Sequence, residues 1–188
     1  MRDPDEVLVS RIGQGDKRAA TELVRRHLPK MVAVARRMLG DAAEAEDVAQ
    51  EVFLRVWKHA ATWTPGQAKF ETWMHRVAMN LCLDRLRRSG RNAGEVSPET
   101  PDLKASATRD LEEKQRSARV HEAILELPER QRAALALCYF QEKSNIEAAD
   151  ILEISVEALE SLLARARRSL KARLASDRAD LLSGLETG

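Results

Sequence analysis

One polar side chain interrupts an apolar helical stretch near the middle of the chain. Asn80 follows Val77, Ala78 and Met79 and precedes Leu81. Its amide both donates and accepts hydrogen bonds, which suits the edge of a nucleotide base. Because an amide without a partner is costly in a core, we interpret Asn80 as a functional residue. The cations that follow it, which suit phosphate groups, are Arg85, Arg87, Arg88 and Arg91.

A second set of polar side chains surrounds a pattern typical of a helix-turn-helix. A short helical stretch, 145–152, is followed by a three-residue turn and a longer stretch from Val156. Ser155 suits the cap of the second helix, because its hydroxyl can accept an exposed backbone N–H. In such modules the first residues of the second helix enter the major groove of DNA. Here these residues are Ser155, Glu157, Ala158, Glu160 and Ser161, followed a turn later by Ala164 and Arg165.

Basic residues continue along the same stretch. They are Arg165, Arg167, Arg168, Lys171 and Arg173. Such cations suit phosphate contacts, which position a protein on DNA without reading its sequence. The alternative is a solvated helix end, where cations are favoured by the helix macrodipole. Charge alone does not decide between the two, and a helical hairpin without a DNA role also stays open.

The composition favours a helical protein of one medium or two small domains. The chain has 188 residues, of which 44% are hydrophobic and 32% charged, and it is rich in Ala, Leu, Arg and Glu, which favour helix over sheet. No stretch approaches the roughly 18 apolar residues of a membrane span. The first residues, MRDPDEVLVSRIGQGD, carry acids where a signal peptide needs basic residues. We therefore expect a cytoplasmic protein without direct membrane insertion.

The cysteines and histidines do not indicate a metal or redox site. Cys82 and Cys138 lie far apart, each in an apolar helical pattern, which predicts buried reduced thiols. A redox pair would require both parts of the chain to meet, which no sequence feature suggests. The histidines lack Cys or acidic partners at ligand spacing, so we expect no metal and no cofactor. They are His27, His59, His75 and His121.

Positive charge is concentrated at the start of the chain, although the overall net charge is only +1. Residues 1–92 carry 17 Lys and Arg against 12 Asp and Glu, a net charge of +5. Residues 93–110 carry 2 against 4 and residues 111–188 carry 12 against 14, so each part has a net charge of −2. A basic first part favours contact with nucleic acid.

The elements that would position these residues are helices. Apolar residues at three- and four-residue spacing predict helices over 16–38, 43–59 and 70–88, and then over 119–127, 128–141, 145–152 and 156–174. Residues 89–110 are rich in Ser, Gly, Pro and acids and lack a hydrophobic period, which predicts a linker. The predicted fold class is all-α, with two small helical domains joined by a flexible linker. We place the domains at 1–92 and 111–175, the linker at 93–110 and a frayed tail at 176–188.

Four stretches of the chain together carry a family resemblance. GDKRAATELVRRH, AEDVAQEVFLRVWKH and KFETWMHRVAMNLCLDRLRR come first, and LPERQRAALALCYFQEKSNIEAADILEISVEALESLLARARRSL follows the linker. The first three resemble the second conserved domain of the extracytoplasmic-function (ECF) sigma factors, which are promoter-recognition subunits of bacterial RNA polymerase. The fourth resembles their fourth domain. The resemblance is specific, because two independent domains agree in the family's order.

The resemblance implies that helix 45–59 docks on the clamp-helix coiled coil of the largest polymerase subunit. The positions that match the interacting residues are Asp47, Gln50, Glu51 and Leu54. Their spacing places them on one side of a helix, and a stripe of carboxylates, an amide and a leucine suits a basic coiled coil. For Asp47 or Glu51 taken alone, the alternative is an ordinary surface acid.

The resemblance assigns helix 70–88 to melting and reading of the minus-ten promoter element. A melted base is held by stacking, by hydrogen bonds to its edge and by backbone charge. Asn80 matches a position that helps to read the captured base, and Lys69 with the loop 63–68 would help to form the pocket. The residues assigned to minus-ten DNA are Lys69, Asn80, Arg85, Arg87 and Arg88.

Two aromatic residues of this helix have alternative interpretations. Phe70 and Trp73 could stack on bases, which would require one of them to be exposed. Packing in the core against Phe53 and Trp57 is the favoured interpretation.

The resemblance assigns the helix-turn-helix to the minus-thirty-five element, with the polymerase flap as a further partner. The assigned residues are Ser155, Glu157, Ala158, Glu160, Ser161, Arg165 and Arg168. Many relatives carry Gly-Thr and then basic residues early in the recognition helix, whereas this chain carries Glu157, Ala158, Glu160 and Leu162. Acids there weaken the attraction to phosphates, although a glutamate can accept from a cytosine amino group.

We therefore predict a non-enzymatic sigma factor that binds core polymerase and promoter DNA. The resemblance adds control by an anti-sigma factor in a stress or envelope response. One alternative is a sigma mimic that titrates an anti-sigma factor without reading DNA, although mimics usually carry a receiver domain that does not fit this length. Another is an ordinary helix-turn-helix repressor or activator, which leaves the first domain unexplained. An enzyme is least supported, because the sequence shows no acid–base pair, nucleophile–base spacing or phosphate loop.

Overall fold

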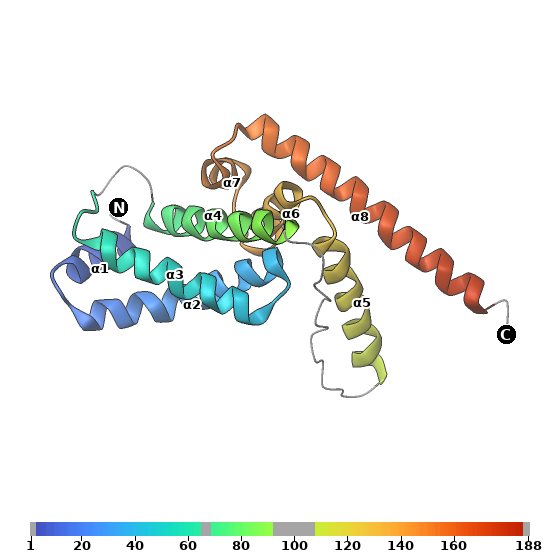
Figure 1. Cartoon of the computed structure of the whole chain (residues 1–188), viewed down its shortest axis with the longest axis horizontal. Coiled ribbons are helices and arrows are strands. Elements are labelled where there is room, and N and C mark those ends of the chain that lie inside the picture. Colours follow the sequence, from blue (N-terminus) through green and yellow to red (C-terminus); the bar gives the residue numbers. More distant parts are fainter. Residues whose placement is uncertain (1–2, 65–68, 92–107, 186–188) are drawn as a thin grey trace.

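The computed structural model describes residues 3–64, 69–91 and 108–185, and the regular elements in these ranges are all helices (Figure 1). This confirms the all-α prediction. The first domain contains α1 (Pro4–Gly13), α2 (Lys17–Leu39), α3 (Ala42–Ala60) and α4 (Phe70–Arg91). The second contains α5 (Thr108–Leu125), α6 (Glu129–Leu135), the π-helical η1 (Ala136–Phe140), α7 (Asn145–Leu152) and α8 (Val156–Leu185).

Local capping signals set the bounds of the first-domain helices. Asp16 accepts hydrogen bonds from the backbone N–H groups of Arg18 and Ala19, at 2.9 and 3.2 Å, where α2 begins. Gly40 ends α2 with a φ of 77°, in the left-handed region that favours glycine. Asp41 then accepts from the Glu44 N–H at 2.7 Å and begins α3. These caps lie where the predicted helix 16–38 ends and the predicted helix 43–59 begins.

Three bounds in the second half differ from the sequence-based predictions. α5 begins at Thr108, inside the segment predicted as linker, most of which lies outside the described residues. The predicted helix 128–141 is divided into α6 and η1. The helix α8 continues to Leu185, inside the segment predicted as a tail. Because Ala, Leu and Arg are good helix formers, adding turns to an existing helix costs little.

The two domains pack against each other, which the sequence did not suggest. α7 lies on α4, and α5, α6 and η1 lie against α2; Figure 1 shows α7 beside α4. Buried side chains of both domains form one apolar cluster that extends from Leu8 to Ala166. Arg37 of α2 lies 4.0 Å from the ring centre of Phe140, in the geometry of a cation–π contact.

A buried arginine joins the second domain to the end of α2. The Arg132 guanidinium donates to the backbone carbonyl groups of Met38, Leu125 and Leu127. The last carbonyls of a helix lack partners within that helix. Arg132 therefore caps α2 from the other domain.

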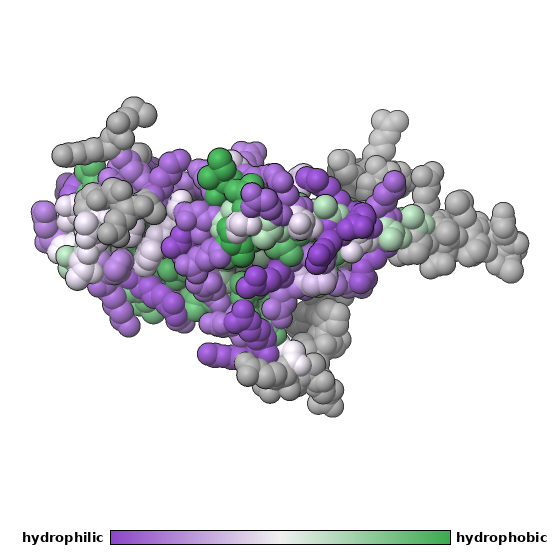
Figure 2. All heavy atoms as spheres, turned by 90° about the horizontal axis from the view of Figure 1, so that it is seen from above, coloured by the Kyte–Doolittle hydropathy of each residue, from purple (hydrophilic) through white to green (hydrophobic). Residues whose placement is uncertain are grey.

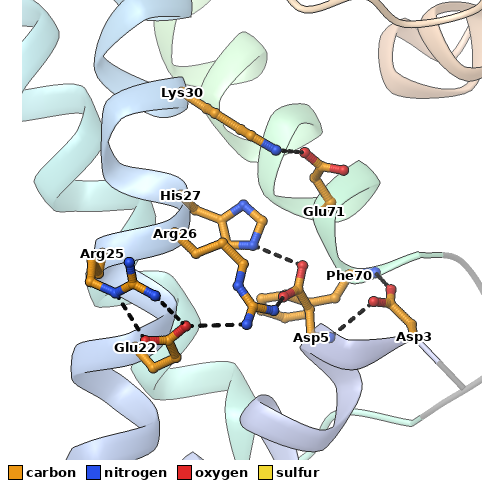
Figure 3. A network of polar contacts seen from close by, with 9 residues as sticks. All are labelled: Asp3, Asp5, Glu22, Arg25, Arg26, His27, Lys30, Phe70 and Glu71. Atoms are coloured by element: carbon orange, nitrogen blue, oxygen red, sulfur yellow. Dashed lines mark hydrogen bonds and ion pairs between the residues drawn. The ribbon is translucent and has the colours of Figure 1, made fainter.

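A buried carboxylate links α1 to α2 (Figure 3). Asp5 accepts a hydrogen bond from Arg26 at 2.7 Å, and its other oxygen lies 2.8 Å from Nε2 of His27. Both Asp5 and His27 are buried. Burial alone would raise the pKa of Asp5, but the hydrogen bonds and charges of His27 and Arg26 outweigh it and lower that pKa.

The same region fixes the beginning of α4. Asp3 accepts from the Phe70 N–H at 3.2 Å, and Lys30 of α2 pairs with Glu71 at 2.8 Å (Figure 3). Lys143 of the second domain pairs with the other oxygen of Glu71 at 3.1 Å. Burial opposes ionisation of Glu71, yet the two lysines lower its pKa to about 2. The start of α4 is thus held from both domains.

The surface seen from above is mostly hydrophilic, with hydrophobic residues gathered near the middle of this face (Figure 2). Ile146 of α7 is the most exposed of the large apolar side chains in the described ranges, at 72%. Among the described residues, helices long and apolar enough to cross a bilayer are absent.

Candidate nucleic-acid and polymerase interfaces

The predicted polymerase-binding residues lie on the open side of α3. Asp47 and Gln50 are exposed, Leu54 is 56% exposed, and Glu51 pairs with Arg55 at 2.9 Å. The opposite side of α3 is anchored in the core by Ala45, Val48, Ala49, Val52 and Val56. Leu54 therefore lies in solvent among polar side chains, on the side of α3 that the family resemblance assigns to the polymerase.

A stripe of polar and aromatic side chains runs along α4. Trp73, Arg76, Asn80, Asp84 and Arg87 recur every three or four residues, so they share one side of the helix. We call these residues, with Lys69 at the start of the helix, the α4 stripe. Arg76 belongs to this stripe, although it was not among the residues predicted from the sequence. Its spacing of four residues from Asn80 is the signal that could have identified it.

Asn80 points to solvent although its neighbours in the sequence are buried, so the inference that its amide lies in an apolar core is wrong. Val77, Ala78, Met79 and Leu81 are between 0 and 9% exposed, whereas Asn80 is exposed. Within the described part of the chain its amide makes no hydrogen bond. The carbonyl oxygen and the NH₂ group of the side chain are therefore both available to an external partner.

The other residues predicted to contact minus-ten DNA have different surroundings. Arg88 is exposed, and Arg87 pairs with Asp84 at 3.4 Å. Arg85 is half-buried and donates to the Glu44 carbonyl of α3 at 3.1 Å. Lys69 pairs with Glu147 of the second domain at 3.1 Å. Part of the predicted pocket loop, 65–68, lies outside the described residues.

An aromatic cluster packs beside the α4 stripe. Phe70 is fully buried, and its ring centre lies 4.9 Å from that of Trp63 and 5.4 Å from that of Trp73. The core interpretation of Phe70 is confirmed, and Phe70 belongs to the same apolar cluster as Phe53 and Trp57. Trp73 is half-buried and stacks on His59 at 5.1 Å.

The second domain presents the predicted helix-turn-helix. Ser155 accepts from the Ala158 N–H at 3.1 Å, which confirms the predicted cap of α8. Leu159 and Leu163 are buried, so the opposite side of α8 faces outward. The outward residues are Glu157, Ser161, Ala164 and Arg168.

The outward face of α8 changes from acidic to basic along its length. Hydrogen bonds from its own backbone N–H and from Ser155 lower the pKa of Glu157, so the start of the face is anionic. Glu160 accepts from Asn145 of α7 at 3.4 Å. Further along, Arg165 and Arg168 line a shallow cleft of about 400 Å³ with Gln131. Arg167 instead donates to the hydroxyl of Tyr139 at 2.7 Å.

The two cysteines are free thiols. Cys82 is buried, which raises its pKa to about 12, whereas Cys138 is only half-buried. The prediction of a buried thiol is thus confirmed for Cys82 alone. The two parts of the chain do meet, since the apolar cluster spans both domains, although no sequence feature suggested it.

Comparison with protein families identifies both domains. The family described as Sigma-70 region 2 matches residues 23–92, and Sigma-70 region 4 matches residues 117–170. Among curated proteins, the RNA polymerase sigma-H factor of Pseudomonas aeruginosa is 32% identical over 90% of this chain and 93% of its own length. The ECF RNA polymerase sigma factor SigM of Mycobacterium tuberculosis is 32% identical over 100% of this chain and 88% of its own.

Solved structures show the same fold. CnrH, in complex with the cytosolic domain of CnrY, superposes with a TM-score of 0.69 at 27% identity, covering 92% of this chain and 98% of that one. RpoE of Bartonella quintana, in complex with the anti-sigma factor NepR, gives a TM-score of 0.67 at 22% identity, covering 84% of this chain and 97% of that one. The chain belongs to the ECF sigma factors of the sigma-70 family.

Proposed function

We propose that this ECF sigma factor docks on core polymerase through the open side of α3 and reads the minus-ten element with the α4 stripe. Sigma factors are transcription initiation factors that direct polymerase to promoters. Because they act on RNA polymerase in the cytoplasm, we propose that this chain is cytoplasmic. The residues that carry docking are Asp47, Gln50, Glu51 and Leu54. Those that carry minus-ten recognition are Lys69, Asn80, Arg85, Arg87 and Arg88.

The exposure of Asn80 carries the proposal. An amide that is held outward by a rigid helix, beside aromatic side chains and cations, suits the edge of an unstacked base. Arg87 and Arg88 lie about two turns further along α4, where a nucleic-acid backbone would continue. Arg85 contributes indirectly, because it ties α4 to α3.

The outward face of α8 suits the minus-thirty-five element. Glu157, Ser161 and Ala164 would face base edges in the major groove, and Arg168 would contact phosphate. An ionised Glu157 favours a cytosine amino group as its partner. Ser155 sets the start of this helix, and Ala158, Glu160 and Arg165 flank the outward face.

Control by a protein partner is the regulation that we propose. CnrH, which shares the fold at 27% identity, has been solved in complex with the cytosolic domain of another protein. We propose an anti-sigma factor as the partner of this chain, in a stress or envelope response.

The test is initiation by reconstituted polymerase. Transcript-start mapping after overexpression supplies the cognate promoter. We expect Asn80→Ala to lower initiation about tenfold, because one base contact contributes about 1–3 kcal/mol, while core binding stays unchanged. We expect Leu54→Ala to weaken core binding instead.

Two results would contradict the proposal. Unchanged initiation by the Asn80 variant would remove the base-reading role. A full chain that binds no promoter with any polymerase would support a sigma mimic instead.

A further inference from the structure

An exposed histidine ends a stack of aromatic rings that begins in the core of the first domain. Phe70 is fully buried, and its ring stacks on that of Trp73, with the ring centres 5.4 Å apart and the planes inclined by 30°. Trp73 is half-buried and stacks in turn on His59, at 5.1 Å and 18°. His59 itself is exposed. The stack therefore starts at α4 and ends with an imidazole ring of α3 that reaches solvent.

Contacts at the end of α3 restrict the orientation of the His59 ring. Its Nδ1 lies 3.3 Å from the hydroxyl oxygen of Thr62, and this hydroxyl donates to the backbone carbonyl of His59 at 3.1 Å. The ring of Trp63 meets the imidazole edge-on, with the ring centres 5.9 Å apart. Because Trp73 supports one face as well, the imidazole is held in place before a ligand binds, which lowers the entropic cost of a further contact.

The surroundings of His59 suit a single nucleic-acid strand. His59 lines a cleft of about 570 Å³ with the cations Lys69 and Arg76. Glu147 and Asp150 of the second domain also line this cleft and pair with the two cations at 3.1 and 3.0 Å. Aromatic rings bind single strands because every base has a π-face that can stack. A base that stacks on an imidazole makes this contact through its uncharged face, so the carboxylates do not oppose it.

The position of His59 decides which ring can receive a base. Stacking of a base on Trp73 is one interpretation of the sequence, and it requires an exposed ring face. In the structure the imidazole of His59 covers one face of Trp73. A base cannot stack on that covered face, but it can lengthen the stack by one ring on the outer side of His59, in the offset geometry that aromatic pairs prefer.

We infer that His59 is a further base-contacting residue, on whose outer face one unstacked base of the minus-ten strand stacks. The inference rests on the proposed function, in which Asn80 reads a base of the same strand. It extends the DNA-binding surface from α4 to the end of α3. Because stacking tolerates every base, His59 contributes affinity for the melted strand, whereas Asn80 contributes the reading of its sequence.

A double-mutant cycle between protein and promoter tests this contact in the holoenzyme. The probes are duplexes of the mapped promoter in which one non-template base of the minus-ten region at a time is replaced by an abasic site. We expect one abasic position to lower open-complex formation by the native protein about tenfold. His59→Leu should lower it equally on the intact promoter and should make that abasic position neutral, because leucine covers Trp73 without offering a ring.

Further variants separate stacking from a structural role. His59→Phe keeps a ring and should respond to the abasic sites like the native protein. His59→Gln keeps a polar side chain without a ring and should behave like His59→Leu. The matched control is Lys58→Leu, at the neighbouring exposed position, which should change the response to no single abasic position. Urea unfolding of each full-length variant verifies that the fold is retained.

The outcomes separate this inference from the proposed function. If every abasic position keeps its effect in both His59→Leu and His59→Gln, no base stacks on His59 and the inference is wrong. If His59→Phe also loses the response, the contact is not stacking and the inference is equally wrong. If His59 is coupled to one abasic position and Asn80→Ala to none, the stacking contact stands while the proposed reading by Asn80 fails.

Discussion

Asp5 illustrates how a single buried carboxylate holds elements together. Its two oxygens satisfy Arg26 and His27, and the net effect of these partners is a lowered pKa. A carboxyl group with a lowered pKa in the folded state stabilises the fold at pH values above its unfolded pKa of about 4. That contribution is lost as the pH falls through the lower folded value.

We expect Asp5→Asn to reduce the free energy of unfolding at pH 7 by about 2 kcal/mol, because it replaces the buried carboxylate that accepts from Arg26 and contacts His27 by a neutral amide. The difference between native and variant proteins should shrink when the pH is lowered from 7 to about 3.5. Urea unfolding at both pH values measures this difference in the free energy of unfolding, and the variant Glu46→Gln, at an exposed position, is the control. An equal difference at both pH values would show that the effect does not come from ionisation.

Single residues also show what sequence reasoning can find. Asn80 was identified because it interrupts an apolar stretch. Ser155 was identified because it is a capping residue between two helical stretches. Asp5 was missed, because its partner His27 is 22 residues away and leaves no local signature. For Arg76 the spacing from Asn80 was available, but its contact with Asp150, 74 residues away, was not predictable.

At the scale of elements, bounds are predictable where the determining contact is local. Gly40 and Asp41 act within about one turn, and the predicted helices around them agree with α2 and α3 to within one or two residues. η1 was not predicted, because its wide turn, closed from the Gln141 N–H to the Ala136 carbonyl, has no reliable sequence signal. The continuation of α8 was missed because a helix of good formers needs a stop signal to end.

α7 depends strongly on Ser144, the capping residue that precedes it. Ser144 and Glu147 form a reciprocal capping box, in which each side chain accepts from the other's backbone N–H. For a helix of 8 residues, this cap is a large part of the local stability.

We expect Ser144→Ala to lower the free energy of unfolding by about 1 kcal/mol. The midpoint of urea unfolding should fall while its slope stays constant. Ser10→Ala, at an exposed position inside α1, provides the control. A midpoint equal to that of the control variant would show that the cap contributes nothing.

At the scale of the whole molecule, the pairing of the two domains was not predictable. The linker composition suggested independent domains, and no local pattern marks a shared core. The contact that joins them most directly, from Arg132 to the Met38 carbonyl, spans 94 residues. Only the folded arrangement brings that carbonyl and that guanidinium together.

Replacement of Arg132 should therefore affect both domains. Lysine keeps the charge but lacks the planar fork that reaches several carbonyls, so we expect Arg132→Lys to cost about 2 kcal/mol. Calorimetry should show one cooperative transition for the native chain and a lower or divided transition for the variant. Arg130→Lys, an exposed neighbour, should unfold like the native chain, and the same behaviour in Arg132→Lys would exclude a joining role.

The long chain separation between Met38 and Arg132 also bears on synthesis. The first domain ends with α4 at Arg91, so at about 5–20 residues per second on the ribosome it is complete for about 2 to 8 seconds before Arg132 has been made. During that interval a nascent chain displays its basic face without α7 above it. Because α4 is synthesised before α7, every newly made chain passes through a short period in which α7 does not cover α4. A ligand near the ribosome would contact this face of α4 during that period.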